Sequence, residues 1–516
     1  MARAAKKRRN DHEANSFQQS QRKDSTTLDC ELGTFLRWCR DTGIDVNKKV
    51  ILWQSCSQQR HHSCQCDTQV RVHVGTEGSC IRYGMIAIDN IAEGEILFTI
   101  PRECLLHPDN CSITALLQQG ESELQSESGW VPLVLCLMFE YTCADSKWRP
   151  YLDLCPDRNQ LDLPMFWDRE TISKELQGTG VPDVVYRDVE NICHEYHSVA
   201  VPFMKKNPEY FDLSVHTLEL YRKLVAFVMA YSFTSPKQTS ESAHEESVDD
   251  DAEEGVDDEA EDVPTLLTMM VPMADILNHV AKNNARLQFG QSRLSMIATR
   301  DINKDEEIFN TYGELPNWQL LQMYGFVEKY PENIYDTVDL PLILLREHLE
   351  FELDDHLAQA KWNFLRDTEE MLDDNIIIGL DGILNKWETY QTLKICTMTS
   401  ADFKKLETSF VDEDLDEEGE DGHIEDSLEE LFSFDGLMDL PSPWRQLLMV
   451  CATKHLKSFK NTMEEDMMLV SEENSTCNAS TLNRRQKYAC YLRIGQRKLL
   501  VKLMQCLKTE SGTGKK

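Results

Sequence analysis

The stretch from residue 273 to residue 326 limits most narrowly what this chain can fold into. It alternates short apolar segments with polar side chains placed directly at the segment ends. Asn278-His279 follow the apolar run 274–277, and Tyr312-Gly313 follow the strand-like segment 307–309. Scaffolds usually present functional side chains at the ends of apolar segments. The pattern therefore predicts a fold of short strands with a site at the strand ends.

An earlier segment, residues 82–100, echoes residues 297–312. In each, an apolar strand crosses a charged turn and resumes at a Glu-Ile pair, with the first turn at Glu93-Gly94. The echo predicts two related β-turn-β units with a long insertion between them. The echo is local and does not indicate a repeat protein.

The insertion, about 101–265, is predicted to be mainly helical. Trp130 opens an apolar helix in which Pro132 occupies the first turn, where proline is tolerated. A second helix is indicated by apolar residues at helical spacing, which are Leu218, Tyr221, Val225, Val228 and Tyr231.

Beyond Phe326 helical patterns dominate, and the apolar stripe of the last one indicates a core-facing helix. These patterns cover 341–374, 384–396, 443–463 and 482–508. The expected organisation is a tail and short helix at 1–69, a first domain at 70–326, and a helical domain at 336–508.

The net charge of −36 on 516 residues is concentrated in two runs. Residues 236–263 hold thirteen acidic residues against Lys237, and residues 411–430 hold twelve and no Lys or Arg. Together they supply two thirds of the net charge. Such runs are typical of solvated, disordered loops, and the alternative is that they attract a basic substrate tail. No basic stripe predicts a duplex nucleic-acid surface.

The 17 cysteines are scattered, and no apolar region typical of a secretory signal follows the basic start. The longest apolar run, Trp130 to Phe139, is too short to span a bilayer. We therefore expect a reducing compartment with free thiols, and Lys6–Arg9 is a candidate nuclear address. A polar stretch gathers possible metal ligands at irregular spacing, with a variable loop as the alternative: Cys56, His61, His62, Cys64 and Cys66.

Several enzyme classes lack their motifs in this sequence. It contains no Gly-x-Ser-x-Gly elbow and no His-Glu-x-x-His, and Gly178-Thr179-Gly180 is not followed by the third glycine of a dinucleotide-binding turn. The segment 512–515 imitates part of a phosphate loop without its strand and helix.

The remaining motifs resemble the SET domain, which transfers a methyl group from S-adenosylmethionine to protein lysine. The similarity is carried by an ordered set of segments, SGWVPLVL, PMFW, LQGTGVP, MAYSF, ADILNH and IFNTYG. Residues 70–326 resemble the SET domain, and residues 336–508 resemble the helical domain of Rubisco large-subunit methyltransferases. The resemblance implies an α+β protein, with a SET-type β-fold that contains a pseudoknot and a helical insertion, followed by an all-α substrate-binding domain.

The resemblance also assigns site residues. It implies that Tyr312 is catalytic and that Trp130, Ser232 and Thr234 line the lysine channel. No cysteine triad follows Tyr312, so the zinc-binding closure of many relatives is missing. In the loop that contacts cofactor, Arg82 replaces a usual glycine and Gly84 retains the next one. The implied cofactor residues are Ile81, Arg82, Tyr83, Tyr231, Asn278, His279 and Tyr324.

The implied chemistry fits these residue types. Lysine, with a pKa near 10.4 in water, must react as the neutral amine, and a narrow aromatic channel favours that form by desolvation. Aromatic faces also tolerate the incoming cation. The tyrosine can align the methyl group through weak CH···O contacts. Spacing alone, however, favours a core tyrosine before a turn glycine at Tyr312, and it is the wider resemblance that favours the catalytic role.

The expected function is monomethylation of lysine on nuclear proteins, including transcription-factor subunits and histones, with S-adenosylmethionine as cofactor, S-adenosylhomocysteine as product and no metal. The expected location is the nucleus, with the cytoplasm as a second location. Neither direct nucleic-acid binding nor membrane binding is expected. Two alternatives stay open: a protein-histidine methyltransferase of the same fold, and a non-catalytic adaptor for basic tails.

Overall fold

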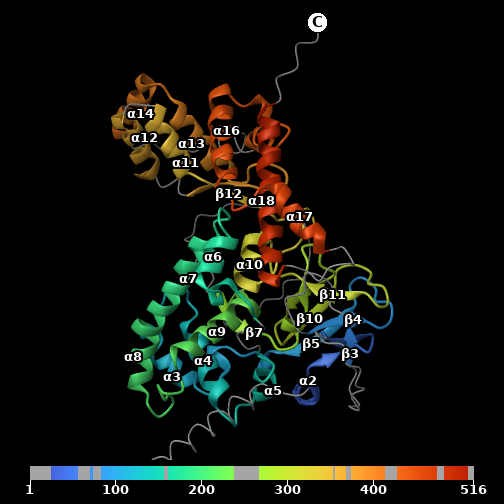
Figure 1. Ribbon diagram of the computed structural model, residues 1–516. Helices are drawn as coiled ribbons and strands as arrows, with labels where there is room; N and C mark the ends of the chain where they lie inside the picture. The colour runs from blue at the N-terminus through green and yellow to red at the C-terminus, as the bar shows by residue number, and fades with distance from the viewer. Residues whose placement is uncertain are drawn as a thin grey trace, which may run out of the picture. The chain divides into compact units, whose positions relative to one another are not determined.

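The computed structural model falls into two compact units. Unit 1 comprises Met1–Asp162, Val189–His279 and Asn283–Thr311, and unit 2 comprises Leu163–Asp188, Val280–Lys282 and Tyr312–Lys516. The residues that the structure describes are 25–55, 70–73, 83–155, 161–236, 266–352, 355–367, 374–412, 427–473 and 482–508. Figure 1 shows strands gathered in unit 1 and helices dominating unit 2. The predicted α+β class is confirmed, whereas the pseudoknot stays a prediction.

Unit 1 contains a four-stranded antiparallel sheet and a five-stranded mixed sheet, both of short strands. The four-stranded sheet has the order β1 (Asp45–Val46), β5 (Ile96–Pro101), β10 (Arg293–Ala298), β9 (Ala285–Phe289). The five-stranded sheet has the order β3 (Val70–His73), β2 (Val50–Ser55), β4 (Tyr83–Ala87), β11 (Glu307–Asn310), β8 (Asn278–His279).

The sequence echo corresponds to a real structural relation. β4 pairs antiparallel with β11, and β5 pairs antiparallel with β10. The two strands of each predicted β-turn-β unit therefore enter different sheets, and the first strand of each unit pairs with the second strand of the other unit. The turns between the strands meet at a bridge between Ile91 and Ile302.

The two turns hold each other by reciprocal hydrogen bonds. The N–H of Glu93 donates to Asp301 Oδ1 at 3.0 Å, and the N–H of Lys304 donates to Asn90 Oδ1 at 3.0 Å. Gly94 and Asp305 occupy equivalent turn positions, with φ of 78° and 68°. Asp tolerates this left-handed conformation better than most residues do, so the second turn can form with Asp305 at the position that Gly94 occupies in the first.

The helices of unit 1 come mostly from the predicted insertion. α4 begins directly after Trp130 and carries Pro132 in its first turn, as the sequence predicted. Its apolar residues are buried on nearly every side, and it packs against α9. The helices are α2 (Ser25–Asp41), α3 (Thr114–Gln119), α4 (Val131–Thr142), α5 (Arg149–Leu152), α7 (Val181–Glu195, begun in unit 2), α8 (Val201–Lys206) and α9 (Leu218–Tyr231), beside the hairpin β6 (Ser232–Pro236) and β7 (Leu266–Met270).

Unit 2 is helical with one addition that the sequence did not predict. β12 (Val338–Pro341) and β13 (Asn375–Ile378) form an antiparallel pair, so the expectation of an all-α domain has to be corrected. The predicted helical stretch 341–374 contains two helices, α11 (Ile343–Glu352) and α12 (Asp355–Asp367). The other helices are α6 (Arg169–Glu175), α10 (Asn317–Tyr324), α13 (Lys386–Thr397), α14 (Ser400–Asp412), α16 (Ser442–Leu456), α17 (Met463–Glu473) and α18 (Arg484–Lys508).

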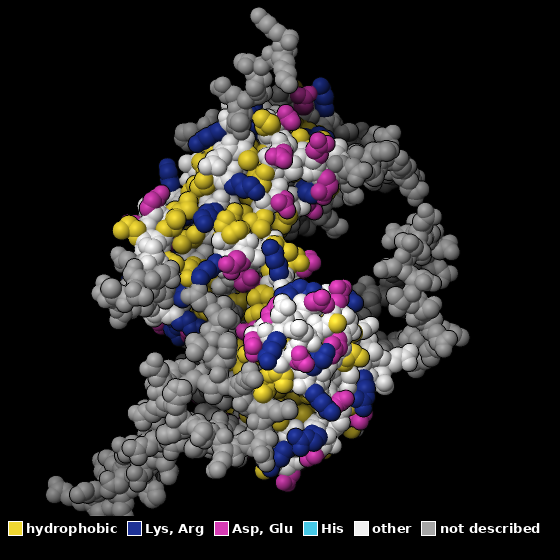
Figure 2. Space-filling view, turned by 90° about the vertical axis from the view of Figure 1, so that its right-hand side faces the viewer, with side chains coloured by type: hydrophobic (Ala, Val, Ile, Leu, Met, Phe, Trp, Pro, Cys, Tyr) yellow, Lys and Arg dark blue, Asp and Glu magenta, His cyan; other side chains and the backbone are white. Residues whose placement is uncertain are grey.

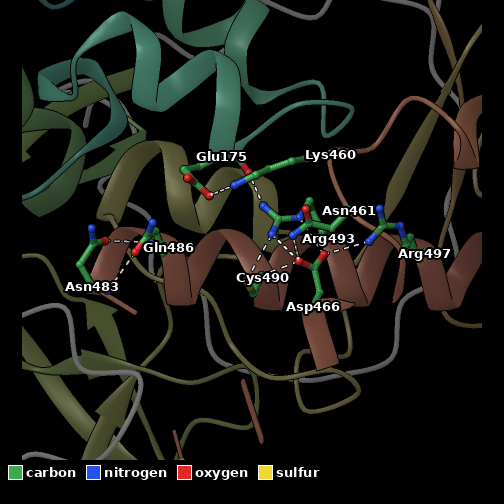
Figure 3. Close-up of polar contacts among 9 residues, drawn as sticks. All are labelled: Glu175, Lys460, Asn461, Asp466, Asn483, Gln486, Cys490, Arg493 and Arg497. Atoms are coloured by element: carbon green, nitrogen blue, oxygen red, sulfur yellow. Dashed lines mark hydrogen bonds and ion pairs between the residues drawn. The ribbon is translucent and has the colours of Figure 1, made fainter. Parts of the chain in front are cut away.

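α18 packs against α16, α17 and β12 and buries charged as well as apolar residues. Its apolar stripe, including Leu499 and Leu503, lies in the core as predicted. Figure 3 shows Arg493 of α18 reaching Asp466 of α17 through two hydrogen bonds, at 2.8 and 2.6 Å. Arg493 also donates to the backbone carbonyl of Glu175, at the end of α6. The arginine therefore ties three helices of unit 2 together.

The described surface carries charges of both signs. On the face in Figure 2, Lys and Arg side chains are interspersed with Asp and Glu and with hydrophobic side chains. Across the described residues, no helix is long and apolar enough to cross a membrane.

Candidate active site

The Asn278-His279 pair forms the whole of β8, which runs parallel to β11 at the edge of its sheet. Asn278 lies opposite Phe309, and His279 lies opposite Asn310. Both are almost completely buried. The Asn278 side chain donates from Nδ2 to the Tyr83 carbonyl at 3.3 Å and to Glu307 Oε1 at 2.8 Å. The amide thus links β8 to β4 and β11, the central strands of the sheet.

The oxygen of this buried amide, Asn278 Oδ1, accepts no hydrogen bond from the described residues. A buried polar atom without a partner costs about 1–3 kcal/mol. A ligand that carries N–H or O–H groups could satisfy this oxygen.

A second buried asparagine, which the sequence did not single out, supports the same strand. Asn284 accepts from the Phe309 N–H at 2.7 Å and donates to the Glu307 carbonyl at 2.9 Å. It closes the loop that follows β8 onto the backbone of β11. The signal was present, since a polar residue directly preceding a strand is a natural partner for backbone groups, but asparagine is too common in turns to be distinctive.

Tyr83 begins β4 and is buried, whereas Ile81 and Arg82 lie outside the described residues. Gly84 has a packing reason to be glycine. A Cβ there would lie 2.4 Å from the Trp53 indole nitrogen, which no side chain could accept without displacing Trp53.

The predicted channel residues Trp130, Ser232 and Thr234 lie in unit 1, together with the predicted cofactor residue Tyr231. Tyr231 ends α9, and Ser232 and Thr234 follow it in β6. Trp130 stands at the start of α4, where its N–H donates to Ser128 Oγ at 3.1 Å. Glu195 accepts from both the N–H and the hydroxyl of Ser128, at 3.0 and 2.9 Å, and so fixes the loop before Trp130.

The aromatic residues after β11 form a cluster in unit 2. The Tyr312 and Tyr324 rings are stacked, with centroids 4.5 Å apart and an interplanar angle of 25°. Phe326 meets both rings edge-on, at 6.4 Å. Tyr324 is the last residue of α10, which ends because Gly325 adopts the left-handed conformation, at φ 76°. The stacking places Tyr312 beside Tyr324, and the catalytic role of Tyr312 and the cofactor role of Tyr324 stay predictions.

Unit 2 also contains a cavity of about 700 Å³. Trp318, Trp362 and Ile343 give it apolar walls, and Asp183 and Lys454 add charged groups. Its volume falls within the range of roughly 300–1,000 Å³ that is common for ligand sites.

The Gly178-Thr179-Gly180 segment forms part of the same cavity wall. Gly178 has φ 82°, and a Cβ there would lie 2.7 Å from the Phe459 backbone, so glycine is required. Gln177 donates to the Ser458 carbonyl at 3.1 Å, and Gln496 donates to the Thr179 carbonyl at 3.3 Å. The wall is therefore fixed by its own contacts.

Among the described residues, no group of three or more His, Cys, Asp or Glu side chains is arranged to hold a metal ion. The Cys56–Cys66 cluster, which the sequence offered as a metal site or a variable loop, lies outside those residues.

Comparison with known proteins identifies the family. The SET domain model matches residues 82–313, and the Rubisco LSMT substrate-binding model matches residues 352–500. The N-lysine methyltransferase setd6 of Danio rerio is 40% identical over 485 residues, covering 93% of this chain and 96% of that protein. The chain belongs to the SET-domain N-lysine methyltransferases. The human relative, N-lysine methyltransferase SETD6, is 38% identical over 478 residues, covering 91% and 94%.

Solved structures agree with this fold. A crystal structure of the SET domain of LSMT bound to lysine and AdoHcy matches with a TM-score of 0.60 at 18% identity, covering 93% of this chain and 91% of that chain. A structure of Rubisco LSMT bound to AdoMet matches with a TM-score of 0.59, at the same identity and coverage. The family predicted from the ordered motifs is confirmed.

Proposed function

We propose that this chain transfers a methyl group from S-adenosylmethionine to the ε-amine of lysine in nuclear proteins, with transcription-factor subunits and histones as the substrate class. The observation that carries the proposal is the pairing of β8 with β11. It buries Asn278 and His279 beside the strand that leads directly to Tyr312. The family's activity and the names of its members support the same reaction.

The buried polar groups of β8 fit the cofactor. S-adenosylmethionine carries amine and hydroxyl donors, and Asn278 Oδ1 is a buried acceptor that can take one of them. Asn278, His279, Tyr83, Tyr231 and Tyr324 would hold the cofactor. When bound, it supplies an electrophilic methyl carbon on a sulfonium.

The chain's own residues would prepare the amine. Trp130, Ser232 and Thr234 would admit a lysine side chain and exclude water, so that the neutral amine is favoured. The nitrogen lone pair forms the new N–C bond as the C–S bond breaks, and the product ammonium then releases a proton to solvent. The Tyr312 hydroxyl would align the reacting atoms by weak contacts with the methyl group. A narrow channel would also limit the product to monomethyl-lysine.

The helical region would dock the protein that carries the lysine. The cavity beside Trp318 and Trp362 offers apolar walls for side chains of such a protein. Trp362→Ala should raise KM for core histones severalfold and leave the cofactor Kd unchanged, because it alters docking and not the cofactor site. An unchanged KM would exclude this cavity from docking. Ala360, on the same helix and outside the cavity lining, offers a matched control as Ala360→Ser.

The deciding experiment combines calorimetry with mass spectrometry. The full chain should bind S-adenosylmethionine, and incubation with core histones should yield peptides with one additional methyl on lysine. Methylation found on histidine would favour the alternative acceptor. Absence of cofactor binding would overturn the enzymatic proposal and favour the adaptor. The basic cluster Lys6–Arg9 leads us to propose a nuclear location, with the cytoplasm as the second; loss of nuclear signal on its replacement by alanines would test this.

A further inference from the structure

A buried carboxyl group in unit 1 lies next to the proposed cofactor residues. Asp275 is part of the short 3-10 helix η6 (Ala274–Ile276), three residues before Asn278, and is 7% exposed. The Tyr151 hydroxyl donates to Asp275 Oδ2 at 2.6 Å, and Tyr151 is buried too. The bond joins α5 to the turn that leads into β8.

The backbone of this turn is strained. Met273 has φ 83° and ψ −43°, although it is not glycine. Such conformations are energetically costly and persist only where the surroundings determine them strongly. The backbone bonds nearby are long, with Asp275 N to Val271 O at 3.3 Å and Ile276 N to Met273 O at 3.4 Å. The short bond to Tyr151 is therefore a main constraint on the turn.

Tyr151 also contacts the element that ends in Tyr231. Its ring lies 6.1 Å from the Phe227 ring, and Phe227 lies 5.1 Å from the Tyr231 ring, centroid to centroid. Phe35 of α2 packs on another side of Tyr151, at 6.3 Å. Tyr151 thus links the turn before Asn278 to the end of α9.

The titratable side chains that interact with Asp275 are a tyrosine and a cysteine. Burial raises the pKa of Asp275 to about 7, although the hydrogen bond from Tyr151 and the N–H groups of Asp275 and Met273 lower it. Burial and then Asp275 raise the pKa values of Tyr151 and of Cys39, which faces Asp275 from α2. The other titratable groups in this cluster face those two side chains: Cys155 and Tyr231 act on Tyr151, and Cys104 acts on Cys39.

We propose that the Asp275–Tyr151 hydrogen bond is a positioning device for cofactor binding, which sets Asn278 and His279 on one side and Tyr231 on the other. The inference rests on the proposed function, because it takes those three residues as cofactor contacts. Neither Asp275 nor Tyr151 needs to touch the cofactor. An ionised carboxylate accepts a stronger hydrogen bond than a carboxylic acid, and it also favours a cationic ligand. Cofactor affinity should therefore rise as Asp275 loses its proton.

The test is calorimetric titration of the full chain with S-adenosylmethionine at pH 6 and pH 8. Tyr151→Phe removes the donor and should weaken binding about five- to tenfold at pH 8, the size of one lost buried hydrogen bond. Asp275→Asn keeps an acceptor for Tyr151 but cannot ionise. From pH 6 to pH 8 the cofactor affinity of wild type should rise about three- to fivefold more than the affinity of Asp275→Asn does. Comparison with this variant removes the ligand's own titration.

Glu140 provides the control in the same unit. It is completely buried and accepts from Ser146 Oγ at 2.5 Å and from the Ser112 N–H at 2.7 Å. Glu140→Gln should lower the melting temperature and leave the cofactor Kd and its pH dependence unchanged.

Two results would overturn the inference, and they differ from each other. Lower melting temperatures with wild-type Kd values and wild-type pH dependence in Tyr151→Phe and Asp275→Asn would make the pair merely structural. No binding by wild type at either pH would overturn the proposed function and this inference with it. If Asp275→Asn fails to fold, Tyr151→Phe, which retains the ring, decides the matter alone.

Discussion

Tyr312 is the residue whose assigned role is most open to a single measurement. It stacks on Tyr324 at 4.5 Å, so its ring is held by packing even without its hydroxyl. Tyr312→Phe should therefore keep the fold and the cofactor Kd. It should lower single-turnover methyl transfer by roughly tenfold to a thousandfold, each tenfold being about 1.4 kcal/mol of barrier. Full turnover in this variant would return Tyr312 to the role of a core residue before a turn.

A substitution at Asn278 should affect cofactor affinity, whereas one at Tyr312 should affect the rate of methyl transfer. Asn278→Ala removes the amide that links β8 to β4 and β11, and with it the open Oδ1. We expect cofactor affinity to fall by about tenfold or more, from about 1–3 kcal/mol of unpaired buried groups. Calorimetry measures this directly.

Asn284→Ala is the matched control, because Asn284 is an equally buried amide whose side chain bonds backbone groups of β11. Asn284→Ala should lower the melting temperature about as much as Asn278→Ala does, but it should weaken cofactor binding less. Equal losses of affinity in both variants would mean that Asn278 acts only through the fold.

For single residues, the sequence predicted which side chains belong to the candidate site better than it predicted the contacts that hold them in place. Asn278 and His279 stood out because they end an apolar run, and the structure buries both in β8. Asp275 did not stand out, since it sits inside that run and its partner Tyr151 is 124 positions away. A lone carboxylate in an apolar run is a signal of burial, but the sequence does not say what it bonds to.

Among the elements, α18 depends on a buried ion cluster. Asp466 binds Arg493 through two bonds and Arg497 through a third, at 2.9 Å, and the Asp466 and Arg493 side chains are fully buried (Figure 3). Breaking such a cluster leaves uncompensated charge. Asp466→Asn should therefore reduce the free energy of unfolding by about 3–5 kcal/mol, measured by denaturant titration.

An exposed ion pair of unit 2 gives the comparison. Arg346 and Glu350 lie on α11 at 2.8 Å, with half-exposed side chains. Glu350→Gln should change stability by less than about 1 kcal/mol. If Asp466→Asn had an effect as small as this, the cluster would not be what holds α17 and α18 together.

The helices of unit 2 were easier to predict than its strands. Periodicity located α13 and α18 to within two residues at each end, because each presents an apolar face over several turns, whereas the stretch predicted at 443–463 extends seven residues beyond the end of α16. β12 and β13 are four residues each and lie on either side of two helices, so neither has a nearby partner in the sequence. Short strands are determined by distant pairing, which local patterns do not contain.

For the whole molecule, the division into units could not have been read from the sequence. Residues 163–188 belong to the predicted insertion, yet they group with the C-terminal helices. Contacts between α6 and α18 support this grouping, since the Arg493 side chain of α18 donates to the Glu175 backbone carbonyl of α6. This division into units does not test the domain boundary predicted near Asp336, which stays a prediction.

In unit 2, two buried groups should make stability depend on pH with opposite signs. Burial raises the pKa of Asp336 to about 7, although bonds from the Asn317 and Thr337 N–H groups lower it. Its unfolded pKa is near 3.9. The native state therefore retains a proton that the unfolded state releases, and the stability that Asp336 contributes is lost as pH rises from about 4 to 7. Burial lowers the pKa of His455 to about 4, so the unfolded state binds the extra proton below its pKa of about 6.5.

Two variants separate these contributions within one pH window. Relative to wild type, Asp336→Asn should gain stability as pH rises from 4 to 7, by up to about 1.4 kcal/mol per pH unit. His455→Gln should lose relative stability between pH 4 and 6.5, because wild type alone gains there as its unfolded histidine loses its proton. Any fixed packing cost shifts each difference curve without tilting it, so the slopes from denaturant titrations at several pH values are the measurement. Parallel curves for wild type and Asp336→Asn would mean that this carboxyl is ionised in the folded protein near pH 5, with its charge compensated inside unit 2. Slopes of opposite sign would show that the net charge of −36 does not by itself set the pH dependence.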